Sequence, residues 1–193
     1  MFLRNHWYVA AFDDEIGHSL LARTILGEDL VLFRRTDGGV VALEDRCAHR
    51  RLPLSAGRLI GDTLECGYHG LVYDTGGSCI KIPGQMHGPS NAMVRAYPAV
   101  ERHRMVYVWM GDAERADPAT IVSFPRLSDP ASGVTKVRLH IKANHLLVLD
   151  NLLDLSHIAY VHNSTIGNSA ALELTTQGLF QRSQISILGE PPQ

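Results

Sequence analysis

Four side chains in one short stretch constrain this sequence more than any other feature: Cys47, His49, Cys66 and His69. They form two pairs, C-x-H and C-x-x-H, and sixteen residues separate the pairs. Thiolate and imidazole are the soft and borderline ligands that hold iron or zinc in proteins. Two segments that each offer one sulfur and one imidazole therefore predict two loops that converge on a metal centre.

The order of the ligands discriminates between the two metals. A structural zinc site usually pairs like ligands, C-x(2–4)-C with H-x(3–5)-H, whereas each pair here is mixed. A [2Fe–2S] centre of the Rieske type needs two thiolates on one iron and two imidazoles on the other, which two mixed loops supply if each spans the cluster. Gly67 and Gly70 allow the second loop to turn sharply. The pattern C-x-H-x(16)-C-x-x-H resembles that of the Rieske family, and a structural zinc site is the alternative.

The third cysteine refines this resemblance. Some Rieske proteins carry an extra cysteine in each ligand loop and join the loops by a disulfide, whereas Cys79 lies beyond both loops. The chain is therefore similar to the oxygenase and soluble-ferredoxin branch. That branch implies a reduction potential at the low end of the range, about −150 mV rather than about +300 mV. Cys79 itself is interpreted as a small buried hydrophobic residue.

Composition narrows the class of protein. The chain has 193 residues, of which 45% are hydrophobic and 20% charged, with a formal net charge of −2. These values are typical of a soluble globular protein, and no long basic run indicates a nucleic acid partner. No apolar stretch reaches the roughly 18 residues of a membrane span, and the N-terminus lacks a signal-peptide pattern. With two of three cysteines committed to metal, we expect a protein of the reducing cytoplasm.

Short strand-like runs and turns fill the sequence from Trp7 to about Gly111. Asp37–Gly39 and Asp74–Gly77 are hairpin signals. Met105–Met110 is a continuous apolar run, which is typical of a buried strand. Strands at this spacing predict a small antiparallel β-sandwich that carries the ligand loops at its hairpin ends.

A second group of polar residues lies downstream in a leucine-rich, helix-like segment: Asn151, Asp154, His157 and His162. The first three are spaced three apart and lie near one face of a helix. His162 is about 140° from His157 on a straight helix, so a shared metal requires the helix to bulge or end between them. Two imidazoles and one carboxylate form the facial triad of non-haem Fe(II) oxygenases. Two satisfied helix histidines are the alternative.

The spacing N-x-x-D-x-x-H-x(4)-H resembles that of oxygenase components with Rieske clusters. The resemblance implies that His157 and His162 bind a mononuclear Fe(II), that Asp154 bridges to a Rieske histidine, and that Asn151 lies close to the iron. It is closest to aryl-ether demethylases such as vanillate O-demethylase and dicamba monooxygenase. It further implies O₂, an aromatic substrate, a partner NAD(P)H-dependent reductase or ferredoxin, and a homotrimer of the full-length protein.

The expected organisation has three parts. Residues 1–112 form the mainly β Rieske domain, and the polar, proline-rich residues 113–133 form a linker. Residues 134–193 form the incomplete first part of an α+β catalytic domain, in which 134–140 alternate as a strand. Downstream of His162 the carboxylates are Glu173 and Glu190, and both are weak candidates for the third iron ligand. We expect a chain truncated in its catalytic domain.

Two alternatives to an oxygenase component remain. The Rieske domain can act alone as an electron-transfer module, since the third iron ligand is missing. A zinc-stabilised interaction domain is the other, and the mixed C-x-H order disfavours it.

Overall fold

The structure, a computed structural model, describes residues 2–85, 91–154 and 157–165. The chain divides into two compact units, Met1–Lys136 and Val137–Gln193.

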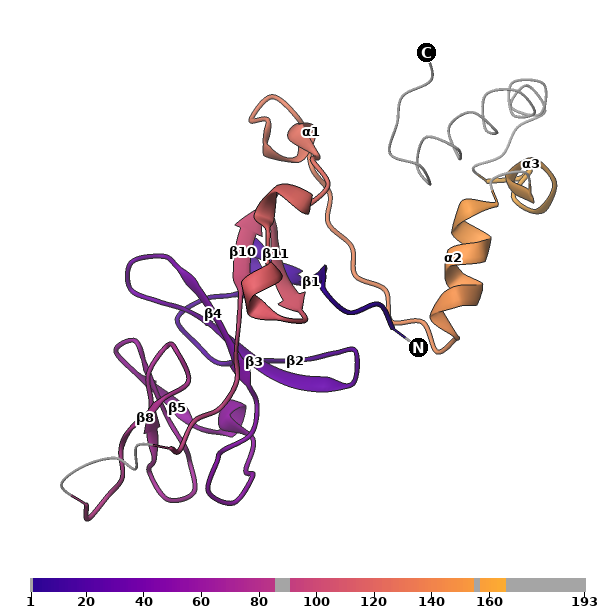
Figure 1. The fold of residues 1–193 in the computed structure, drawn as a ribbon. Helices are drawn as coiled ribbons and strands as arrows, with labels where there is room; N and C mark the ends of the chain where they lie inside the picture. Colours follow the sequence, from indigo (N-terminus) through magenta and orange to yellow (C-terminus); the bar gives the residue numbers. More distant parts are fainter. Residues whose placement is uncertain (1, 86–90, 155–156, 166–193) are drawn as a thin grey trace. The chain divides into compact units, whose positions relative to one another are not determined.

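The first unit is built from antiparallel strands and short 3₁₀ helices (Figure 1). The strands are β1 (His6–Phe12), β2 (Leu21–Ile25), β3 (Glu28–Arg34), β4 (Val40–Glu44), β5 (Arg58–Ile60), β6 (Thr63–Glu65), β7 (Val72–Tyr73), β8 (Cys79–Lys81), β9 (Ala96–Tyr97), β10 (Ala99–Arg102) and β11 (Met105–Met110). The 3₁₀ helices are η1 (Asp13–Glu15), η2 (Leu54–Ala56), η3 (Ala113–Arg115) and η4 (Pro118–Thr120), and a short helix α1 (Pro125–Ser128) follows them.

These strands form three sheets, with the orders β1-β11-β10, β2-β3-β4-β9 and β5-β6-β7-β8. Figure 1 shows the sheet that contains β3 and β4 between the β5–β8 hairpins and the β1, β10 and β11 strands. Every pairing is antiparallel, and bulges interrupt the β1–β11 and β7–β8 ladders. The expected mainly β, antiparallel fold is confirmed, with three sheets where a simple sandwich was expected.

Strand β3 explains why a third layer exists. Leu30 and Leu32 belong to one hydrophobic core, while Val31 and Phe33 belong to the other, and all four side chains are fully buried. Successive residues of a strand point to opposite faces of a sheet. The middle sheet is therefore buried on both faces.

The two cores differ in composition. The distal core lies between the middle sheet and the β1-β11-β10 sheet and is purely structural. Its buried members are Ala10, Ala11, Ile16, Ile25, Leu30, Leu32, Ala42, Tyr97, Val106, Val108 and Met110. The other core, called here the ligand core, joins the middle sheet to the β5–β8 sheet. It contains Val31, Phe33, Val41, Leu43, Cys47, Leu54, Leu64, Cys66, Leu71, Tyr73, Cys79 and Val94.

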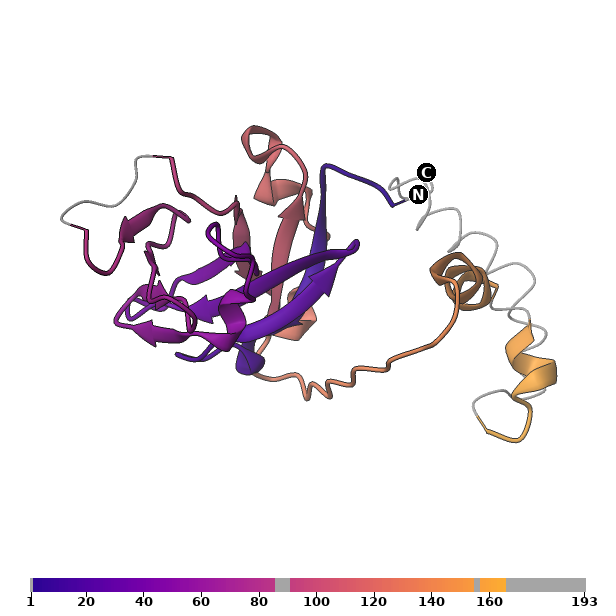
Figure 2. The ribbon, with the colours of Figure 1, turned by 90° about the horizontal axis from the view of Figure 1, so that it is seen from below.

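The boundary between the two units falls within residues 134–140. These residues form neither strand nor helix, so the strand predicted there is wrong. Figure 2 shows the chain between α1 and α2 as a ribbon without strand or helix. A strand requires a partner for its backbone groups, and among the described residues none pairs with this segment.

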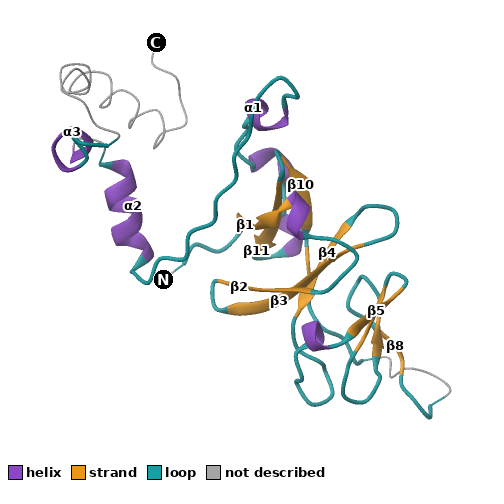
Figure 3. Cartoon of the chain, turned by 180° about the vertical axis from the view of Figure 1, so that it is seen from behind, coloured by secondary structure: helices purple, strands orange, loops and turns teal. Residues whose placement is uncertain are grey.

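The leucine-rich segment forms the helix α2 (His145–Leu153), which is drawn as a purple coil in Figure 3. Asn144 caps it by accepting a hydrogen bond from the Leu146 N–H at 3.0 Å. Five leucines of α2 are between 49% and 65% exposed: Leu146, Leu147, Leu149, Leu152 and Leu153. A helix of this composition gains most of its stability from surfaces that cover its apolar side chains.

Within the described part of the chain, no helix combines the length and the apolar character that crossing a membrane requires.

Candidate metal centres

The first ligand loop closes on itself through its backbone. The Cys47 N–H donates to the Leu52 carbonyl at 2.9 Å, and the Arg51 N–H donates to the Cys47 carbonyl at 2.9 Å. This ring of hydrogen bonds places Cys47 at the base of the loop and His49 at its tip.

The second loop repeats the same ring. The Cys66 N–H donates to the Leu71 carbonyl at 2.8 Å, and the Gly70 N–H donates to the Cys66 carbonyl at 3.1 Å. Arg51 and Gly70 occupy the same position of the two rings, and both have left-handed backbones, with φ of 58° and 69°. Glycine adopts this conformation without strain, whereas arginine does so at a cost of about 1–2 kcal/mol.

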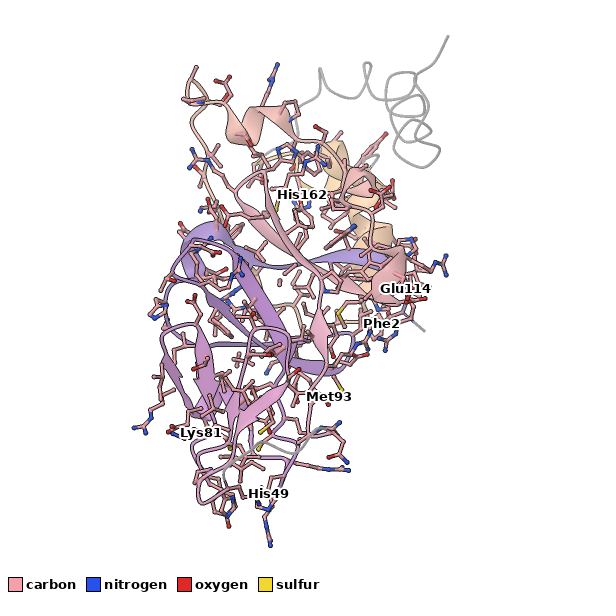
Figure 4. The ribbon with its side chains drawn as sticks, turned by 60° about the vertical axis from the view of Figure 1, so that its left-hand side comes forward. Phe2, His49, Lys81, Met93, Glu114 and His162 are labelled. Atoms are coloured by element: carbon pink, nitrogen blue, oxygen red, sulfur yellow. The ribbon has the colours of Figure 1, made fainter. Side chains whose placement is uncertain are left out.

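The two rings bring like ligands together. Cys47 and Cys66 are 2% and 1% exposed, and their thiol groups contact each other within the ligand core. The rings of His49 and His69 are exposed, with centroids 4.6 Å apart. Figure 4 shows His49 at the outer end of the first unit. All four predicted ligands therefore converge, with the sulfurs inside and the imidazoles at the surface.

This arrangement fits a two-iron cluster better than a single zinc ion. Zinc in a structural site holds four ligands around one point. Here the two ligand types are separated, with the sulfurs buried in the ligand core and the imidazoles exposed at the surface. A Rieske cluster needs two sulfurs on one iron and two imidazoles on the other. The structure groups the two cysteines and the two histidines in the same way.

Cys66 lies in an environment that disfavours the negatively charged thiolate unless a metal binds it. Burial raises the pKa of the Cys66 thiol above its ordinary value, and the neighbouring Cys47 adds to this effect. Coordination requires the thiolate form, so cluster binding displaces protons from these buried groups. Cys79 is a free, buried cysteine whose thiol lies near the Lys81 carbonyl at 3.5 Å, as expected for a small core residue.

Tyr73 is a site residue that the sequence did not reveal. Its side chain is fully buried, and its hydroxyl oxygen lies 3.2 Å from Cys47 Sγ and accepts a hydrogen bond from the Ala48 N–H at 3.0 Å. A coordinated sulfur carries no proton, so the hydroxyl donates to it. Burial and then the contact with Cys47 raise the pKa of Tyr73, which keeps this proton in place. In the sequence, Tyr73 is only a strand residue that precedes a turn.

A cavity of about 560 Å³ adjoins the two imidazoles. Its walls are mostly apolar, and they are formed by Ala48, His49, His69, Leu71, Ile82, Pro83, Gln85 and Ala92. The histidine edge of the centre is thus open to a partner molecule.

The second group of candidate ligands lies around the break between α2 and α3 (Ile158–Val161). His157 is the N-cap and His162 the C-cap of α3, and their ring centroids are 5.4 Å apart. Helix α2 ends at Leu153, before both histidines, and α3 ends at Val161, between them. A four-residue helix between the two caps therefore brings the rings together.

Asp154 and Asn151 lie at the end of α2, and both are exposed. The main-chain oxygen of Asp154 contacts Nδ1 of His157, which leaves Nε2 of that ring available as a metal-binding nitrogen. The other carboxylates considered as the third ligand, Glu173 and Glu190, lie outside the described residues. Within the described residues, no acidic side chain completes a group of three with His157 and His162.

Comparison with known proteins agrees with this geometry. Residues 6–98 match the Rieske [2Fe–2S] domain, and residues 141–183 match the vanillate O-demethylase oxygenase C-terminal domain. The chain is 47% identical over 175 residues to the iron-sulfur subunit of the toluene-4-sulfonate monooxygenase system of Comamonas testosteroni, covering 90% of this chain and 50% of that protein. It is 41% identical over 192 residues to the oxygenase component of dicamba O-demethylase of Stenotrophomonas maltophilia, covering 99% of this chain and 57% of that protein.

A crystal structure of dicamba monooxygenase with non-haem iron and dicamba superposes with a TM-score of 0.77 and 44% identity, covering 81% of this chain and 48% of that one. The chain spans about half the length of the curated relatives it matches. Residues 6–98, with their paired cysteines and paired histidines, belong to the Rieske [2Fe–2S] domain family, in a chain whose homologues are oxygenase components of the dicamba and vanillate O-demethylase type.

Proposed function

We propose that the chain belongs to the oxygenase component of a Rieske non-haem iron monooxygenase that hydroxylates or O-demethylates an aromatic compound. One observation carries the proposal: a sorted Cys₂/His₂ centre and a second histidine pair occur in the same chain. An NAD(P)H-dependent reductase, directly or through a ferredoxin, is the proposed electron source, and the cytoplasm is the proposed compartment. The similarity to toluene-4-sulfonate monooxygenase and dicamba O-demethylase components supports an aromatic substrate.

The proposed cofactors are a [2Fe–2S] cluster on Cys47, Cys66, His49 and His69, and a mononuclear Fe(II) on His157 and His162. When bound, they supply single electrons and the activation of O₂ that hydroxylation of a C–H bond requires. Hydroxylation of an aryl methyl ether at its methyl carbon gives a hemiacetal, which collapses to a phenol and formaldehyde.

Different residues of the chain have different roles in this proposal. The buried cysteines and Tyr73 keep water from one side of the cluster, while the exposed histidines offer the edge at which electrons enter and leave. We propose that Asp154 carries the hydrogen-bonded bridge from the iron site to a Rieske histidine of a neighbouring subunit in a homotrimer. Asn151 is proposed to lie close to the iron. The third ligand is proposed to be a carboxylate from outside the described residues.

An electron-transfer module is the second candidate function. It is favoured by one observation, namely that no described carboxylate joins His157 and His162. In that case the first unit alone is functional and the second histidine pair binds no iron.

The deciding experiment measures iron, acid-labile sulfide and zinc per chain on anaerobically purified protein. About three irons with two sulfides support the oxygenase component, whereas two irons with two sulfides support the electron-transfer module. Zinc without sulfide contradicts both functions.

Two variants assign the metals to their sites. His157→Ala is expected to remove about one iron and leave the sulfide unchanged, because it lies in the second unit. His49→Ala is expected to remove the cluster iron and sulfide. Iron loss in the opposite pattern would contradict the assignment of both sites.

A further inference from the structure

Asp45 stands out among the described residues because it is the one charged side chain that is buried, at 8% exposure. Its carboxylate accepts two short hydrogen bonds from Ser55, one from the backbone N–H at 2.6 Å and one from the hydroxyl at 2.5 Å. The Asp45 N–H donates to the Asp29 carbonyl of β3 at 2.9 Å. Hydrogen bonds to a buried carboxylate are stronger than those between neutral groups. Asp45 therefore joins the middle sheet firmly to η2.

Asp45 lies two residues before the ligand Cys47, so it marks the start of the first ligand loop. Ser55 lies in η2, whose Leu54 is fully buried in the ligand core beside both cysteines. The pair of hydrogen bonds thus fixes η2 relative to the first loop.

The end of η2 and the residue that follows it lie against the second loop. A methyl group added at Gly57, directly after η2, would collide with the Glu65 carbonyl oxygen, and one added at Gly67 would lie 2.8 Å from the Ala56 carbonyl oxygen. Glu65 and Gly67 flank Cys66 in the chain. The backbone of η2 is therefore in direct contact with residues on both sides of this ligand.

No covalent bond joins the two ligand loops, because Cys47, Cys66 and Cys79 are free. Their separation must therefore be set by packing and hydrogen bonds. A two-iron cluster demands that all four ligand atoms hold their positions at once, and a site is only as exact as the groups that support it.

We propose that Asp45 and Ser55 form a positioning clasp that sets the distance between the two ligand loops through η2. The clasp acts on the ligands without contacting the cluster. The inference rests on the proposed cluster site. It adds the residues that hold the two ligand loops at a fixed separation.

The chain contains a matched control. Asp62 accepts hydrogen bonds from the Thr36 N–H at 2.7 Å and from the Thr36 hydroxyl at 2.9 Å, which is the same pair of contacts. This pair joins the β3–β4 turn to the β5–β6 turn and contains no residue of either ligand loop. A change at Asp62 therefore reports the cost of losing the same two contacts at a more exposed position outside the ligand loops.

The test uses the 193-residue chain with its cluster and compares four variants: Ser55→Ala, Asp45→Asn, Ser55→Thr and Asp62→Asn. Two quantities are measured, the g-values of the reduced cluster by EPR and the rate at which an iron chelator removes the cluster. Ser55→Ala and Asp45→Asn are expected to shift the g-values and to speed cluster loss about tenfold, since each removes or weakens hydrogen bonds to a charged group. Ser55→Thr keeps the hydroxyl and is expected to behave as wild type, as is Asp62→Asn.

The outcomes separate the possible failures. Unchanged g-values and unchanged loss rates in Ser55→Ala, in a wild-type protein that holds its cluster, would overturn the clasp alone. Absence of acid-labile sulfide from the wild-type protein would overturn the cluster assignment and the clasp together. If Asp45→Asn does not fold, the Ser55→Ala and Ser55→Thr pair decides the matter by itself.

Discussion

Replacing Tyr73 with phenylalanine removes one hydroxyl group beside Cys47 and leaves the aromatic ring of this buried side chain in place. The hydroxyl has two partners, Cys47 Sγ at 3.2 Å and the Ala48 N–H at 3.0 Å. Two separate losses follow from the same change. The sulfur loses a hydrogen-bond donor, and the Ala48 N–H loses its acceptor.

The first loss changes the reduction potential. A hydrogen bond donated to a ligand sulfur stabilises the reduced cluster more than the oxidised one, because reduction adds negative charge. If about 1 kcal/mol of a typical charge-assisted hydrogen bond differs between the two states, the potential falls by about 40 mV, since about 59 mV corresponds to a tenfold change for one electron. The second loss destabilises the fold by about 1–3 kcal/mol, which is the usual cost of an unsatisfied buried donor.

The midpoint potential is measured by protein-film voltammetry or by an EPR-monitored redox titration, and the stability by thermal unfolding. Tyr107→Phe is the control, because the Tyr107 hydroxyl has only a weak contact with Met105 Sδ at 3.9 Å, away from the ligand loops. It is expected to leave the potential unchanged. An unchanged or raised potential in Tyr73→Phe would refute the inference that this hydroxyl donates to the cluster ligand.

Two further predictions concern the scaffold. Gly70→Ala is expected to destabilise the protein by more than the roughly 1–2 kcal/mol of left-handed strain alone, because its added methyl would lie 3.0 Å from Pro83 Cγ. Gly61→Ala, with φ of 58° and open space around it, is expected to show the strain alone, and equal unfolding free energies for the two variants would contradict this. Burial by itself would raise the pKa of Glu28, but hydrogen bonds from Tyr97 and Arg4 hold it below its ordinary value of 4.5. The ionised form thus stabilises the fold above that pH, so the Tm gap between wild type and Glu28→Gln is expected to be widest at pH 7 and to narrow as the pH falls below 4.5. A Tm difference that widens as the pH falls would contradict this prediction.

Where chemistry selects the residue type, the sequence was sufficient to predict that side chains lie together. The convergence of Cys47 and Cys66 with two histidines was predictable, because few other arrangements mix two cysteines with two histidines at this spacing. Tyr73 was not predictable, because its role depends on how closely the first ligand loop approaches β7. That approach is a property of tertiary packing and leaves no local pattern.

One physical requirement explains why one strand prediction was correct and another was wrong. Met105–Met110 was correctly predicted from its apolar run, because burial on both sides selects such a run. Residues 134–140 were predicted as a strand from their alternation, yet Val137 and Leu139 are 68% and 76% exposed and no described strand pairs with them. Alternation reports a side-chain pattern, whereas a strand also needs a neighbour for its backbone.

The alternation along β3 has a consequence for the unfolding of the first unit. Because this strand contributes side chains to both cores, displacing β3 disrupts both of them at once. Stability is therefore shared between the two cores through β3, and its amide protons should be among the slowest to exchange with solvent. Strengthening the distal core, far from any iron ligand, would then also slow the opening through which the cluster is lost.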